Sequence, residues 1–68
     1  MKVKYFKDTD TALLEFSEAP VRETREISEN VYVDLDERGN PVSMTIEHAT
    51  TLAQFPVVTL EGIGAGAP

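Results

Sequence analysis

The chain has 68 residues, and twelve acidic side chains against six basic ones give a formal net charge of −6. It contains no cysteine and a single histidine, His48, which excludes a disulfide framework, a thiolate metal site and a cysteine nucleophile. A chain of this length forms at most one domain and has little volume for a deep pocket. Because nucleic-acid-binding domains are usually basic, the charge balance argues against nucleic acid and anionic membranes as partners.

No apolar run approaches the roughly 20 residues that a membrane-spanning helix requires. The first residues alternate lysine with apolar side chains and contain no hydrophobic segment of the kind found in signal peptides. Without cysteines or an export signal, we expect a cytoplasmic protein that uses no cofactor and binds neither membrane nor nucleic acid.

The dominant period along the chain is two, which is typical of β-strands with one apolar and one polar face. Residues 1–6 and 12–17 both alternate in this way, and the aspartate-rich segment 7–10 between them predicts a turn. Pro20 ends the pattern, and residues 21–27 resume it with the polar middle expected of an edge strand.

The segment 31–35 is the strongest predicted strand, because it is rich in β-branched and aromatic residues. The following segment 36–40 contains Asn40 and Gly39, which tolerate positive φ, and predicts a tight turn. Residues 42–47 then alternate again and predict a fifth strand.

The C-terminal part of the chain departs from this period. Residues 49–55 predict a short helix that Thr50 or Thr51 could cap and that Pro56 would stop. Residues 57–60 could add a last short strand.

These elements predict a mainly β fold on the border of α+β, with an antiparallel sheet of about five short strands and one short C-terminal helix. Antiparallel pairing follows because every connection is too short for a parallel crossover. We expect one small domain over residues 1–61, with a flexible Gly/Ala tail at 62–68. The helix or a second copy of the chain would cover one face of the sheet.

Aromatic side chains point to self-association. Phe6 and Tyr32 alternate to the side opposite the main apolar face, and Phe55 lies in the C-terminal segment. If both faces carry apolar groups, the second must be covered by the helix, the tail or another chain. We therefore expect a homo-oligomer with Phe6, Tyr32 and Phe55 in its interface.

Paired aspartates are the strongest candidates for chemistry. Asp34 and Asp36 share one side of the predicted strand, with Cα atoms about 7 Å apart, and could hold Mg²⁺ or Ca²⁺ through oxygen ligands. We favour local hydrogen bonding at the turn as the explanation of both residues, and the spacing of a calcium loop is absent. Asp8 and Asp10 are interpreted as turn formers. Because no nucleophile elbow or phosphate loop is present, we expect no catalytic residue and no metal site.

Three segments carry a family resemblance. Residues 5–16 place a tyrosine in the first strand, an aspartate five residues later and then an apolar strand. Residues 23–27 contain Glu-Thr-x-Glu, and residues 31–39 read Val-x-Val-Asp-x-Asp-x-x-Gly. Over residues 1–50 the chain resembles the small bacterial and archaeal proteins called domain of unknown function 2283. The family's closing Gly-Ile-Glu-Ile-x-x-Ala-Ser motif differs here, where residues 43–50 read Ser-Met-Thr-Ile-Glu-His-Ala-Thr.

The resemblance implies no established activity, but some relatives stand beside genes for small toxin-like ribonucleases, which implies an antitoxin-like role. Our first hypothesis is a non-enzymatic acidic domain that self-associates through its sheet. The alternative is an antitoxin-like regulator whose acidic surface, with the segment from Thr51 onward, binds a small basic ribonuclease. A third hypothesis is a divalent-metal-dependent enzyme that uses Asp34 and Asp36.

Overall fold

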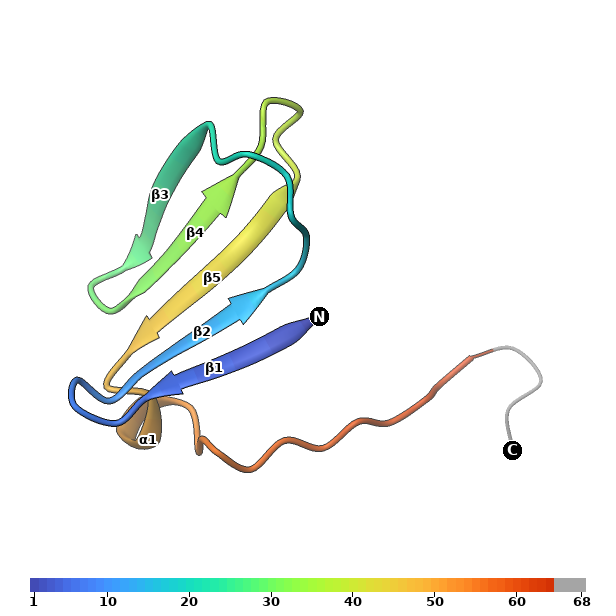
Figure 1. The fold of residues 1–68 in the computed structure, drawn as a ribbon. Helices are drawn as coiled ribbons and strands as arrows, with labels where there is room; N and C mark the ends of the chain where they lie inside the picture. The colour runs from blue at the N-terminus through green and yellow to red at the C-terminus, as the bar shows by residue number, and fades with distance from the viewer. Residues whose placement is uncertain (65–68) are drawn as a thin grey trace.

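A computed structural model of the chain describes residues 1–64, which form one antiparallel sheet followed by a single short helix (Figure 1). The elements are β1 (Lys2–Phe6), β2 (Thr11–Glu15), β3 (Glu23–Ser28), β4 (Val31–Leu35), β5 (Pro41–Glu47) and α1 (Ala49–Leu52). The predicted mainly β, antiparallel fold is confirmed, and the ends of the five strands differ from the prediction by at most two residues. Most of the predicted tail, residues 65–68, lies outside the described part.

The strands lie in the order β1-β2-β5-β4-β3, and every neighbouring pair is antiparallel. Strands β3, β4 and β5 follow one another through hairpins, and β2 lies beside β5, which is a Greek-key arrangement. The long connection, residues 16–22, passes around the end of the sheet from β2 to β3 (Figure 1). Its ends are fixed by the amide of Phe16, which donates to the carbonyl of Val42 at 2.8 Å, and by that of Arg22, which donates to Leu35 at 2.7 Å.

The register of the strands separates apolar from polar side chains. Because residues paired across a sheet share a face, the pairings gather one set of apolar residues on a single side. We call this side the apolar face; it contains Val3, Tyr5, Ala12, Leu14, Val31, Val33, Met44 and Ile46. The opposite polar face contains Lys2, Lys4, Phe6, Leu13, Glu15, Thr24, Glu26, Tyr32, Asp34, Ser43 and Thr45.

No second layer covers the apolar face within residues 1–64. The buried apolar residues are Ala12, Val42 and Ala49, and in this part of the chain no large side chain is fully buried. At the β1 edge, Val3 keeps 43% of its surface exposed and Tyr5 keeps 36%. Domains normally bury an apolar sheet face against a second layer, and the described residues provide no such layer.

The helix is shorter than predicted and sits at one end of the sheet (Figure 1). It has four residues, Ala49–Leu52, and therefore ends well before Pro56. The predicted caps Thr50 and Thr51 are wrong, because His48 occupies the N-cap position with φ 56° and makes no capping hydrogen bond through its side chain. Among residues 1–64, no helix has the length and apolar character to cross a membrane.

The predicted strand at 57–60 is also wrong. Residues 57–64 continue as an irregular segment, and the amide of Val57 donates to Gln54 at 3.0 Å rather than to the sheet. Gln54 itself has φ 52°, which redirects the backbone just after the helix. The β-branched sequence favours a strand, but in this chain the segment meets no strand edge with which to pair.

Two local features shape the ends of the sheet. In the turn at 36–40, the amide of Gly39 donates to the Asp36 carbonyl at 3.0 Å, and Gly39 adopts φ 80°, which confirms the predicted turn. On the edge strand β3, a register shift between Glu26 and Ser28 marks a β-bulge.

Candidate functional site

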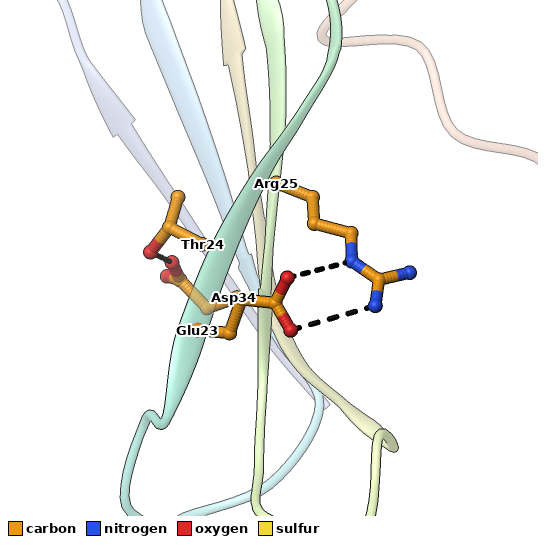
Figure 2. A network of polar contacts seen from close by, with 4 residues as sticks. All are labelled: Glu23, Thr24, Arg25 and Asp34. Atoms are coloured by element: carbon orange, nitrogen blue, oxygen red, sulfur yellow. Dashed lines mark hydrogen bonds and ion pairs between the residues drawn. The ribbon is translucent and has the colours of Figure 1, made fainter.

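The largest candidate site is the apolar face itself. Its centre is formed by Leu14, Met44 and Val33, which lie side by side on β2, β5 and β4 and are all half-buried. At the β3 edge the face ends in an exposed ion pair, in which the Nε of Arg25 lies 2.9 Å from the Oε2 of Glu23 (Figure 2). The hydrogen bond and positive charge of Arg25 hold the pKa of Glu23 below its usual value, so this border stays charged. The site is thus an apolar surface with one ionic edge.

The three aromatic residues predicted for the interface are divided between the two faces. The ring of Phe55 packs against Tyr5 of the apolar face, with centroids 5.0 Å apart. Phe6 and Tyr32 lie on the polar face, where Phe6 keeps 49% of its surface exposed. Only Phe55 therefore touches the surface that lacks a covering layer.

Asp34 joins three strands on the polar face. The hydroxyl of Thr24 on β3 donates to its Oδ1 at 2.5 Å, and that of Ser43 on β5 donates to its Oδ2 at 2.6 Å. Figure 2 shows Thr24 and Asp34 on the side of the sheet opposite the Glu23–Arg25 pair. The hydrogen bonds from Ser43 and Thr24 lower the pKa of Asp34, because they favour the carboxylate.

Asp36, the second predicted metal candidate, turns toward its own loop. Its Oδ1 accepts hydrogen bonds from the amides of Arg38 and Asn40, both at 2.9 Å. Asp34 and Asp36 thus accept hydrogen bonds from different donors and do not converge on one point. The contacts of Asp36 are those expected of an aspartate that organises a turn. Within residues 1–64, no group of three or more histidine, cysteine or acidic side chains is arranged to hold a metal ion.

Asp10 fixes the C-terminal segment to the first hairpin. Its Oδ1 accepts a hydrogen bond from the hydroxyl of Tyr5 at 2.6 Å, and its Oδ2 accepts one from the hydroxyl of Thr50 at 2.8 Å. Its carbonyl also accepts from the amide of Ala49 at 2.9 Å. The hydrogen bond from the Tyr5 hydroxyl lowers the pKa of Asp10 most, and the hydrogen bond from Thr50 lowers it further. The hydrogen bond between Tyr5 and Asp10 also raises the pKa of Tyr5. Asp10 therefore supplies acceptors for the start of α1 that a capping side chain would otherwise provide.

Sequence reasoning treated Asp10 only as a turn residue and missed this cluster. Thr50 lies 40 residues away along the chain, and no local pattern indicates such a contact. The one available signal was the spacing of Tyr5 and Asp10, which the family pattern contains.

The comparisons with known proteins identify a family but no characterised relative. A family model described as "Protein of unknown function (DUF2283)" matches residues 2–49, which spans the whole sheet and the start of α1. No curated protein and no solved structure matches the chain significantly.

Asp34 should make the sheet sensitive to acid. The pKa of Asp34 is lower in the folded chain than in the unfolded one, so its carboxylate stabilises the fold fully above about pH 4. This stabilisation is lost as the pH falls through the pKa of Asp34 in the folded chain. Asp34→Ala leaves the buried hydroxyl of Ser43 without its acceptor. We expect the free energy of unfolding at pH 7 to fall by about 1–2 kcal/mol, less than at a fully buried site because solvent screens the carboxylate.

Urea denaturation followed by circular dichroism at pH 7 and pH 3 measures both effects. The variant should lose less stability than the parent between these two values, whereas Glu18→Ala, at an exposed position outside the strands, should behave as the parent. An unchanged pH dependence in Asp34→Ala would contradict the assigned hydrogen bonds.

Tyr5→Phe tests the Asp10 cluster. It removes the hydroxyl that donates to Asp10 but keeps the ring that packs on Phe55, so the pKa of Asp10 should rise toward its ordinary value. NMR titration of the side-chain carboxyl carbons measures this rise directly. Tyr32→Phe is the matched control, since the hydroxyl of Tyr32 donates only to the Glu29 carbonyl, at 3.4 Å. Equal shifts of the pKa of Asp10 in the two variants would refute the cluster.

Proposed function

This chain belongs to the DUF2283 family, a family without an assigned activity, and for this member we propose a non-enzymatic role as a small acidic domain that self-associates through its apolar face. The observation that carries the proposal is the single-layered sheet. Its central residues Leu14, Val33 and Met44 are only half-buried, and within residues 1–64 the cover lies at the α1 end of the face, where Phe55 packs on Tyr5. A second copy would provide the missing layer.

The distribution of charge supports a face-to-face pair. Across β1, β2, β4 and β5 the apolar face carries no charged residue, and its charges are confined to Glu23 and Arg25 on β3. In a twofold pair the apolar strands would meet at the centre, while the ion pair would stay at the rim and in water. Neither charge would then need to be buried.

The state of the carboxylates supports a role without catalysis. Asp10 and Asp34 are both occupied by hydroxyl donors that lower their pKa. At neutral pH such groups remain ionised, so they have no proton to donate and are weak bases. Their contacts serve the structure: Asp34 connects strands β3, β4 and β5, and Asp10 holds α1.

Sedimentation velocity over a micromolar concentration series tests the proposal. We expect a dimer that Val33→Asp weakens by about tenfold or more, because a charge would enter the apolar centre. Thr45→Asp adds the same charge to the polar face and should leave the dimer intact. Since Val33→Asp could unfold the sheet, Val3→Asp at the exposed β1 edge provides a second variant. A monomer at every concentration, or equal effects of the charges on both faces, would refute this function.

The second candidate function is that of an antitoxin-like regulator of a small basic ribonuclease. The segment after Phe55 favours it, because Val57, Val58 and Leu60 expose 72–96% of their surface and offer apolar contacts to a partner. The net charge of −6 would attract a basic protein, and that attraction would weaken in salt.

A tagged pull-down at low and high salt, followed by light scattering, separates the two functions. A stoichiometric small basic protein that salt releases would support the regulator, and its ribonuclease activity could then be assayed with and without the domain. Elution of a homo-oligomer alone would favour the self-associating domain.

A further inference from the structure

Among the described residues, those after α1 form a segment that does not pair with the sheet. We call residues 56–64 the C-terminal arm; it runs away from the strands as an extended segment, coloured orange to red in Figure 1. Four apolar side chains of the arm are among the most exposed of the described residues: Val57 at 73%, Val58 at 72%, Leu60 at 96% and Ile63 at 88%. After Val57 the described part of the arm makes no backbone hydrogen bond to the sheet. A globular chain rarely exposes such a run without a partner surface.

The arm starts from a fixed point on the border of the apolar face. Phe55, immediately before it, packs on Tyr5, and Thr50 is held by Asp10. These contacts place the first residue of the arm beside the surface that self-association would cover. The arm therefore begins beside the apolar face and then runs away from the strands, and both surfaces keep apolar side chains exposed.

The area of the face indicates why the arm is needed. Strands spaced by about 4.8 Å, with five residues at about 3.4 Å each, give the five-stranded face a footprint of about 400 Å². Stable protein interfaces bury about 800 Å² on each partner. The four apolar side chains of the arm would each add roughly 100 Å² of buried surface. The arm would therefore add substantially to the apolar surface that the face alone can bury.

We propose that the C-terminal arm of each copy lies against the sheet of the second copy, so that two arms are exchanged across the dimer. This inference rests on the proposed self-association. The arm extends that interface beyond the rim of the apolar face and buries Val57, Val58, Leu60 and Ile63 against the partner. The cover that each sheet lacks is then supplied by the C-terminal arm of the other chain.

The chain contains no cysteine, which permits a direct test. In Gly62→Cys a nitroxide is attached to the single thiol, and this labelled protein is mixed with ¹⁵N-labelled chain that carries no nitroxide. We expect amide signals from the apolar face, such as those of Val33 and Met44, to broaden in the ¹⁵N-labelled copies. Broadening that occurs only when nitroxide and ¹⁵N are in one chain would mean that the arm folds onto its own sheet, which overturns the proposal.

Sedimentation of the same samples distinguishes the two possible failures. Monomers would overturn the proposed function, whereas dimers without broadening between copies would overturn only the exchange of arms. In the dimer, Leu60→Asp should weaken association by about tenfold, the change that corresponds to about 1.4 kcal/mol. Thr59→Asp places the same charge at the neighbouring polar position and should have a much smaller effect, because it removes no apolar side chain from the interface. Both positions lie outside the strands, so neither variant should unfold the sheet.

Discussion

A single sheet has two faces, and within residues 1–64 a four-residue helix is the only further element with which to cover either of them. The exposure of the sheet faces follows from this small amount of covering structure. The alternation of the strands concentrates the apolar side chains on one side, and the pairing of β2 with β5 joins two hairpins into one continuous surface. The same segregation that makes the sheet possible therefore leaves a surface that water contacts, at a substantial cost in hydrophobic stabilisation. Within residues 1–64 no element of secondary structure supplies a covering layer.

Polar contacts have a different role from apolar packing in this protein. The carboxylate of Asp34 binds hydroxyls from the strands on both sides of β4, and that of Asp10 connects the first hairpin to a segment 40 residues further along. Each contact depends on direction as well as distance, so it favours one register and one placement of the chain. The polar side thus specifies the arrangement within one copy, while the apolar side stays partly open to solvent.

The sequence was sufficient to predict the five strands, the turn at Gly39 and the polar character of β3, because all three depend on neighbours in the chain. It could not predict that β2 lies beside β5, since the pairing of distant strands leaves no local pattern. The helix was predicted too long because Leu52 and Phe55 have helical spacing, whereas the structure uses Phe55 to contact Tyr5. For the site, alternation placed Phe6 and Tyr32 on the side opposite the main apolar face, but it could not reveal that the main face itself lacks cover.

The two edges of the sheet differ in how readily they could accept a further strand. On β3, charged side chains project to both sides, Arg25 to one and Glu26 to the other, and the bulge between Glu26 and Ser28 interrupts the ladder of backbone groups. Such an edge resists the addition of another strand. On β1 the register is regular, and its lysines lie on one face only. A sheet with one resistant edge can be extended by added strands in one direction but not in both, which disfavours open-ended fibrils.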